Sequence, residues 1–233
     1  CRGLPDYQHT AWYPVIEYCQ RWLKWRPGEA PDAALEQLEA FLAQAHLPLA
    51  ETVPLIAALL ALPLPAERYP AQPLPPEQQR QYTLDTFLTL AGVLAEQQPM
   101  LLIYEDLHWM DPSTLELLTL LIDQVPTARI FMVLTCRPTL QFPWGFRTHL
   151  TPIVLNRLTP PQVEAMVEQM LRGRHLPAAV LEQIVVKTDG IPLFVEEVTK
   201  AVLEAGRDTD IPEQDMVSGP LPALDIPTTL HEA

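Results

Sequence analysis

The chain has 233 residues, 26 of them proline and only 8 glycine, and its formal net charge is −14. Proteins that bind a phosphate backbone carry a basic patch, so this acidic composition argues against direct nucleic-acid binding. The glycines are also far apart, the nearest two being Gly206 and Gly219. That spacing excludes a GxGxxG dinucleotide fingerprint, a GxxxxGK[ST] phosphate loop and a GxSxG nucleophile elbow within these residues.

Hydrophobic residues make up 48% of the chain, enough to bury a substantial core. The longest apolar run, residues 53–66, contains three prolines and is shorter than the roughly 20 residues of a membrane helix. Cys1, Cys19 and Cys136 form no CxxC pair and are odd in number, which favours free thiols over disulfides. We therefore expect a cytoplasmic protein without a membrane segment.

The first part of the chain is predicted to be helical. One helix begins near Tyr13 and ends before Pro27, and a second opens at Pro31, with apolar residues recurring at helical spacing. Residues 47–76 form a proline-rich connection around a short apolar helix. A longer helix over residues 77–97 carries a continuous apolar face.

The pattern then changes to that of an α/β fold. Residues 99–104 and 129–135 are short, continuous apolar runs, typical of parallel strands buried on both faces. Asp111 and Pro112 form an N-cap and a first helical position, so a helix is predicted to connect the two strands. A right-handed crossover of this kind gives a parallel sheet, for which residues 153–155 are a third, weaker strand candidate.

Beyond residue 157 the sequence predicts helices only. They cover about 160–172, 178–188 and 193–205; Thr159 and Gln162 form a capping box, and Gly190 and Gly206 stand at C-cap positions. Residues 207–233 are polar and proline-rich. We expect an α/β core over residues 1–156, a helical subdomain over 157–206 and a linker over 207–233.

Two adjacent carboxylates, Glu105 and Asp106, follow the first predicted strand. Open parallel sheets bind their ligands at the carboxyl ends of the strands, and carboxylates there can hold Mg²⁺ or orient a water molecule. The alternative, equally weighted on the residues alone, is that both are solvated loop acids.

Arg137 ends the second predicted strand. It could face a phosphate group beside the acidic strand end, or it could simply pair with Glu105 or Asp106. Asp111 is better explained as the N-cap than as a site residue. His108 is weak evidence for a metal, since no second ligand stands three or four residues away, and Trp109 is expected to pack at the helix start.

Three segments in this order carry a resemblance: EDLHWMDPSTLELL (105–118), LTCRP (134–138) and GIPLFVEEV (190–198). They resemble the AAA-like ATPase module of the signal-transduction ATPases with numerous domains, the STAND class. The resemblance is greatest to modules that accompany adenylate/guanylate cyclase domains, or helical repeats in LuxR-type and other large bacterial regulators. It implies a P-loop NTPase sheet with flanking helices, followed by a helical lid.

The resemblance also implies roles for individual residues. Glu105 and Asp106 match the Walker B acids that hold Mg²⁺ and serve catalysis, although an Asp is more usual at the position of Glu105. Arg137 matches the sensor-1 position, and Gly190 and Pro192 match the GxP segment, whose proline contacts adenine. The phosphate loop and first core strand would lie upstream of Cys1, so the chain is expected to be an internal fragment.

The expected function is an ATP-binding and ATP-hydrolysing regulatory switch that signals to flanking domains of the same polypeptide. The fragment alone is expected to be inactive, since the loop that supplies most phosphate affinity is missing from it. An alternative is a catalytically inert interaction scaffold built on the same fold. A nucleotide cyclase parent is a third alternative, with its own catalytic acids in another domain.

Overall fold

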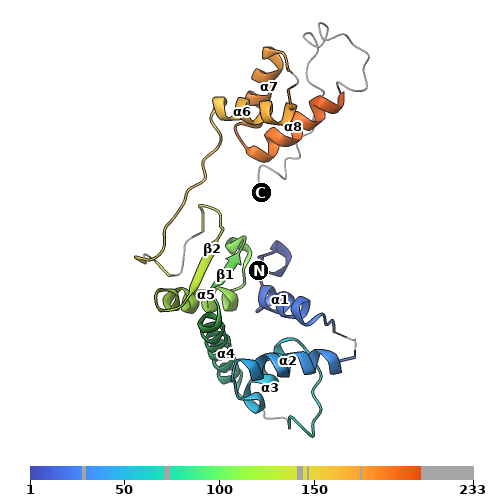
Figure 1. The fold of residues 1–233 in the computed structure, drawn as a ribbon, viewed down its shortest axis with the longest axis vertical. Helices are drawn as coiled ribbons and strands as arrows, with labels where there is room; N and C mark the ends of the chain where they lie inside the picture. The colour runs from blue at the N-terminus through green and yellow to red at the C-terminus, as the bar shows by residue number, and fades with distance from the viewer. Residues whose placement is uncertain (28–29, 71–73, 141–143, 146, 174, 206–233) are drawn as a thin grey trace. The chain divides into compact units, whose positions relative to one another are not determined.

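The computed structural model describes residues 1–27, 30–70, 74–140, 144–145, 147–173 and 175–205 (Figure 1). The chain divides into two compact units, Cys1–Thr151 and Pro152–Ala233, and each is described by itself. The two predicted features at the end of the chain, a C-cap at Gly206 and a linker over 207–233, lie outside the described residues. The expected end of the α/β core at residue 156 stays a prediction.

Four helices begin the first unit, and all four confirm predicted elements. They are α1 (Tyr13–Leu23), α2 (Asp32–Gln44), α3 (Leu49–Leu59) and α4 (Pro76–Gln97). The apolar positions of α2 and α3 face each other, so Leu38 and Leu42 pack with Val53 and Ile56 in a buried cluster. A second cluster joins Leu84 of α4 to Val15 of α1 and to Leu117 and Leu121 of the helix Pro112–Gln124.

The sheet of the first unit is parallel, as predicted. Its strands β1 (Met100–Tyr104) and β2 (Ile130–Leu134) pair in register from Met100 opposite Ile130 to Tyr104 opposite Leu134. Helix α5 (Pro112–Gln124) is the connection between them (Figure 1). The mixed α/β architecture is therefore present, with a sheet of two strands in the described residues.

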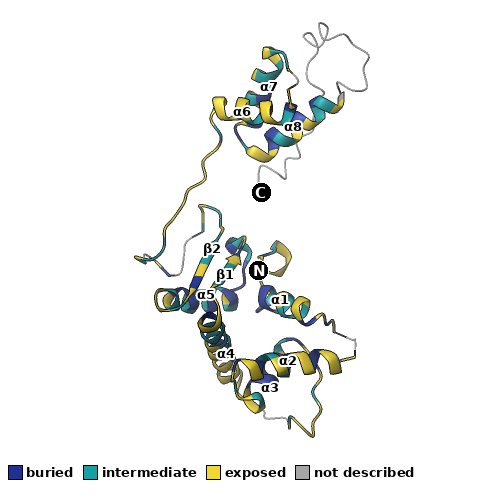
Figure 2. Cartoon of the chain, viewed as in Figure 1, coloured by how far each residue is buried: buried dark blue, intermediate teal, exposed yellow. Residues whose placement is uncertain are grey.

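The prediction that both strands are buried on both faces is wrong for the described residues. Leu101 is 59% exposed, Ile103 45% and Phe131 68%, whereas Tyr104 and Ile130 are buried (Figure 2). Alternate residues of a strand point to opposite faces. One face packs on α5 and its neighbours, and no described helix covers the other.

The third predicted strand, residues 153–155, is also wrong. Ile153, Val154 and Leu155 lie outside any strand and are 80%, 74% and 91% exposed. An apolar run becomes a strand only where a neighbouring strand accepts its hydrogen bonds. No described segment pairs with this one.

The second unit consists of α6 (Pro160–Leu171), α7 (Ala178–Thr188) and α8 (Pro192–Ala205), which confirm the three predicted helices. Their apolar faces meet in a cluster of buried residues, among them Val163, Val167, Ile184, Val195 and Val198. The predicted capping box opens α6, where Thr159 N donates to Gln162 Oε1 at 2.9 Å. In the described residues of both units, no helix is long and apolar enough to cross a membrane.

Candidate functional site at the strand ends

The carboxyl ends of β1 and β2 are joined by hydrogen bonds on both sides of Thr135. Thr135 N donates to Tyr104 O at 3.0 Å, and Leu107 N donates to Thr135 O at 2.9 Å. The Thr135 hydroxyl accepts a third bond, from Asp106 N at 3.1 Å. The structure therefore brings the acidic end of β1 against the end of β2, two residues before Arg137.

Asp106 occupies a left-handed backbone conformation, with φ +57° and ψ +49°. Asp tolerates this region better than most residues because its short side chain can hydrogen-bond locally. The turn reverses the chain after β1 and starts a short 3-10 helix, Leu107–Trp109. Glu105, one residue earlier, is exposed.

The carboxylate of Asp106 pairs with an arginine that the sequence did not suggest. Arg2 Nε lies 2.8 Å from Asp106 Oδ2. The guanidinium of Arg137 lies over the Trp109 ring, with its central carbon 5.8 Å from the ring centre. The two alternatives for Arg137, pairing with an acid and facing a phosphate, stay predictions.

The segment Cys1–Gly3 reaches this site by running parallel to β1. Glu105 N donates to Cys1 O, and Gly3 N donates to Glu105 O, both at 2.9 Å. A Cβ at Gly3 would lie 2.5 Å from Asp106 O, so only glycine fits there without a shift. Sequence reasoning missed Arg2 and Gly3 because a contact across about a hundred residues leaves no local pattern.

His108 lies close to both charged groups of the site. Its pKa is lowered from the ordinary value, first by burial and then by the nearby Arg137, while Asp106 acts in the opposite direction. Its Nδ1 is buried and has no hydrogen-bond partner among the described residues. Burial and Arg137 thus both favour the neutral imidazole.

Asp111 is confirmed as the N-cap of α5. Its carboxylate accepts hydrogen bonds from Ser113 N, Thr114 N and the Thr114 hydroxyl. It also accepts one from Trp12 N at 3.0 Å, which ties the start of α1 to the start of α5. With 1% of its surface exposed and its acceptors occupied, Asp111 is a structural residue.

Gly190 and Pro192 belong to the second unit and are far from the strand ends in the sequence. Asp189 is the C-cap of α7, one residue before the predicted position, and Gly190 follows it with φ +71°. Gly190 O accepts from Leu158 N at 2.7 Å, and a Cβ at Gly190 would collide with Leu158 O. This glycine thus has a backbone role of its own, while Pro192 is the exposed first residue of α8.

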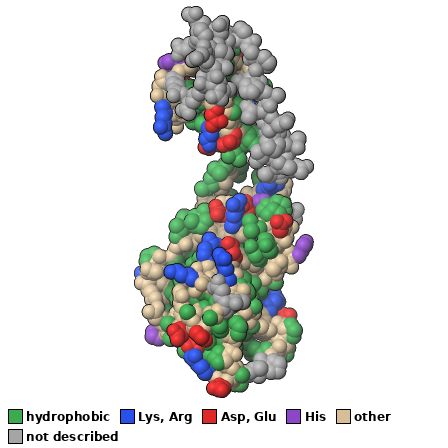
Figure 3. All heavy atoms as spheres, turned by 90° about the vertical axis from the view of Figure 1, so that its right-hand side faces the viewer, with side chains coloured by type: hydrophobic (Ala, Val, Ile, Leu, Met, Phe, Trp, Pro, Cys, Tyr) green, Lys and Arg blue, Asp and Glu red, His purple; other side chains and the backbone are tan. Residues whose placement is uncertain are grey.

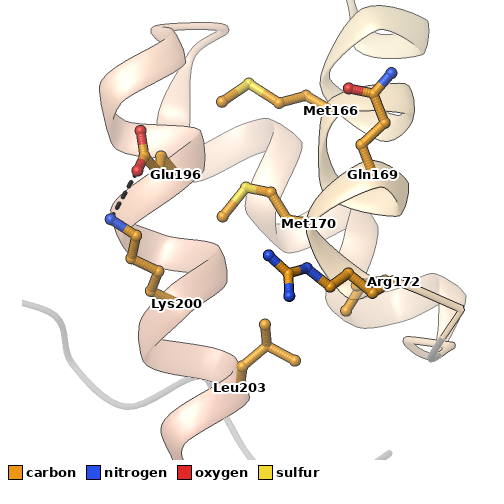
Figure 4. A pocket seen from close by; sticks show the side chains of 8 residues that line it. Met166, Gln169, Met170, Arg172, Glu196, Lys200 and Leu203 are labelled. Atoms are coloured by element: carbon orange, nitrogen blue, oxygen red, sulfur yellow. Dashed lines mark ion pairs between the residues drawn. The ribbon is translucent and has the colours of Figure 1, made fainter.

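A cavity of about 770 Å³ lies between α6 and α8 of the same unit. Figure 4 shows Met166 and Met170 of α6 directed toward α8, with the ion pair of Lys200 and Glu196 on the other side. Arg172, the left-handed C-cap of α6, stands at its edge. Sequence reasoning missed this cavity, because the methionines there match the apolar stripe of any packed helix.

The donor set at the strand ends suits Mg²⁺ rather than a transition metal. Mg²⁺ is held by one or two carboxylates and completes its shell with water and phosphate oxygens. Glu105 and Asp106 are two such groups, and the described residues contain no cluster of three or more His, Cys, Asp or Glu able to hold a metal. The phosphates of a nucleotide fit less well, since the 233 residues contain no glycine-rich loop to surround them.

On the face drawn in Figure 3, acidic and basic side chains alternate with hydrophobic ones.

Comparisons of the chain with protein-family models, with curated proteins and with solved structures give no match.

Proposed function

We propose that the chain is part of a regulatory ATPase switch of the P-loop type, in which the ends of β1 and β2 form the metal-binding and water-facing side of an ATP site. The observation that carries this proposal is the junction at Thr135, which holds Asp106 beside the end of the neighbouring parallel strand. Open parallel sheets use this position for ligands. The order of the three motif segments adds to the support.

Each residue at the junction has a definite role in this proposal. Glu105, which is exposed, would hold Mg²⁺ through its carboxylate. Asp106 would accept a hydrogen bond from the attacking water and orient it. Bound Mg²⁺ would supply positive charge to the phosphate oxygens, and Arg137 would add a second positive charge on the side of β2. Gly190 and Pro192 match the GxP segment, to which the resemblance assigns adenine binding.

The 233 residues alone should not bind ATP, because backbone amides and the lysine of a phosphate loop provide most of the phosphate affinity in such sites. Calorimetric titration of this chain with Mg-ATP should give no measurable heat of binding. Tight binding by the chain would contradict the proposal.

The positive test needs a longer polypeptide in which a phosphate loop precedes these residues. There, Asp106→Asn should reduce ATP hydrolysis much more than ATP binding, because the amide keeps the shape but no longer accepts a proton. Asp85→Asn, on the exposed side of α4, is the matched control and should change neither. An equal loss of binding and hydrolysis in Asp106→Asn would argue against the role in orienting water.

An inert interaction scaffold is the second candidate, favoured by the ion pair of Arg2 with Asp106. A carboxylate that is already paired with an arginine is a poorer Mg²⁺ ligand, because the metal has to displace the guanidinium. If Arg2 and Asp106 serve only to hold the first residues in place, the longer polypeptide should hydrolyse no ATP, with or without Asp106→Asn. The absence of hydrolysis in the unchanged polypeptide would select the scaffold over the ATPase.

A further inference from the structure

A cavity separate from the strand ends lies between α6 and α8 in the second unit. It is lined by residues of these two helices and by the C-cap of α6: Met166, Gln169, Met170, Leu171, Arg172, Glu196, Lys200 and Leu203. Its volume of about 770 Å³ is within the range of about 300–1,000 Å³ that is typical of small-molecule sites. All of these residues belong to one unit, so the cavity involves neither the strand ends nor the first residues of the chain.

The apolar wall of the cavity can adapt its shape. Figure 4 shows the side chains of Met166 and Met170, one turn apart on α6, directed toward α8, while Leu203 lies on the wall formed by α8. Both methionines are half-buried. Methionine side chains are unbranched and carry a polarisable sulfur atom, so they can move to fit apolar molecules of different shape. The wall therefore suits an apolar ligand body without requiring one particular outline.

Arg172 supplies a positive charge at the edge of this wall. Its side chain is exposed, forms no ion pair or hydrogen bond with any described residue, and extends toward α8 in Figure 4. The Nζ of Lys200, in contrast, lies 2.7 Å from Glu196 Oε1 and 3.1 Å from Glu197 Oε1, so its charge is already compensated. A guanidinium presents its N–H donors in one plane and binds the oxygens of acidic groups in pairs. The cavity thus combines an apolar wall with an uncompensated guanidinium.

We propose that the cavity between α6 and α8 binds a small amphipathic anion, a molecule with an apolar ring system and one acidic group. The ring system lies against Met166, Met170 and Leu203, and the acidic group accepts hydrogen bonds from Arg172. A cationic ligand is disfavoured, because Glu196 is already paired and Arg172 repels a positive charge. A neutral ligand would gain only the burial of its apolar surface. This site is independent of the proposed ATP site.

The test is a fluorescence titration of the full chain with anilinonaphthalene sulfonate, a dye that combines an aromatic ring system with one sulfonate. Phenylnaphthylamine has the same ring system without the sulfonate and is the matched neutral probe. We expect saturable binding of the anionic dye. For each dye the comparison is made between variants of the chain, because the neutral dye is less soluble and its affinity contains a larger apolar contribution.

Arg172→Gln removes the charge and keeps a side chain of similar polarity. It should weaken binding of the anionic dye about fivefold and leave binding of the neutral dye within about twofold of the unchanged chain. Lys187→Gln is the matched control, because it removes an exposed positive charge from α7 of the same unit, outside the cavity. It should change the binding of either dye by less than about twofold.

Nuclear magnetic resonance of isotope-labelled methionine methyl groups shows where the dye binds in the unchanged chain. Bound anionic dye should shift the signals of Met166 and Met170 and leave those of Met110 and Met132, in the first unit, unchanged.

Three results would overturn the proposal. The first is the absence of saturable binding, which would also follow if another part of the chain occupied the cavity. The second is a set of shifts confined to methionines of the first unit, and the third is equal weakening by Arg172→Gln and Lys187→Gln. Asp106→Asn should bind the dye normally, which separates this result from the fate of the ATPase proposal.

Discussion

Arg2 and Asp106 form an ion pair between residues 104 positions apart, with 2.8 Å between Nε and Oδ2. The pair joins the first residues of the chain to the turn that follows β1. It also neutralises one of the two carboxylates to which the ATPase proposal gives a role. Any Mg²⁺ or water at Asp106 therefore competes with Arg2.

Replacing Arg2 by alanine should have a small effect on stability. The arginine side chain is 66% exposed, and exposed ion pairs contribute about 0–1 kcal/mol. We expect Arg2→Ala to lower the free energy of unfolding by less than about 1 kcal/mol in urea denaturation, and less still at high salt. Arg21→Ala, which removes the exposed pair with Glu17, is the matched control. A loss of several kcal/mol in Arg2→Ala alone would mean that the pair is essential to the fold.

Glycine 3 should not tolerate a side chain. The Cβ of alanine would lie 2.5 Å from Asp106 O and 3.0 Å from the Trp109 carbonyl carbon, so backbone has to move. Gly3→Ala should cost about 1–3 kcal/mol, measured by thermal or urea unfolding. Gly92→Ala, in the interior of α4 with nothing within 4 Å, should instead stabilise by about 0.5–1 kcal/mol. The same sign for both variants would contradict the close approach at Gly3.

The N-cap at Asp111 should be one of the most sensitive polar positions of the first unit. Asp111→Ala removes the cap of α5 and leaves Trp12 N buried without an acceptor. The expected loss is about 2–4 kcal/mol in the free energy of unfolding. Asp111→Asn retains a carbonyl oxygen and should lose clearly less. If the alanine and asparagine variants are equally destabilised, the negative charge rather than the hydrogen bonding is what matters.

The lowered pKa of His108 predicts a pH dependence of stability. Between its folded pKa and 6.5 the unfolded chain binds more protons than the folded chain, so His108 makes stability rise with pH and then level off above 6.5. His108→Gln should remove that increment. Urea unfolding between pH 5 and pH 8 measures the difference, with His9→Gln, an exposed residue, as control. An unchanged pH profile in His108→Gln would show that Arg137 and burial do not act on this ring.

Local patterns predicted much of this molecule. The helices and the N-cap at Asp111 depend on residues within one or two turns of each other, and the structure confirms them. The parallel pairing of β1 and β2 followed from the apolar runs and the helix between them. What the sequence did not reveal depends on distant partners: the ion pair of Arg2, the close packing at Gly3, and the exposed face that carries Phe131.

The prediction of a strand at residues 153–155 was wrong for the same reason, since a strand also depends on a distant partner. Three β-branched and aliphatic residues have the propensity for a strand, but propensity cannot supply the neighbouring edge on which a strand depends. The sequence did place Glu105 and Asp106 correctly at the end of β1. Their position is a local property, because a chain that leaves a parallel strand must turn at the strand end. Their chemical partners, in contrast, could not be read from the adjacent residues.

The three hydrogen bonds at Thr135 have a mechanical consequence. They link the turn at Asp106 to the end of β2, so a displacement of the turn also displaces the end of β2, and the reverse. The main chain of Arg137 and that of Asp106 therefore move together when a force acts on either of them. A force applied to the chain after residue 137 would act along β2 and reach the turn at Asp106 through the main-chain hydrogen bonds of Thr135. No flexible side chain is needed on this path.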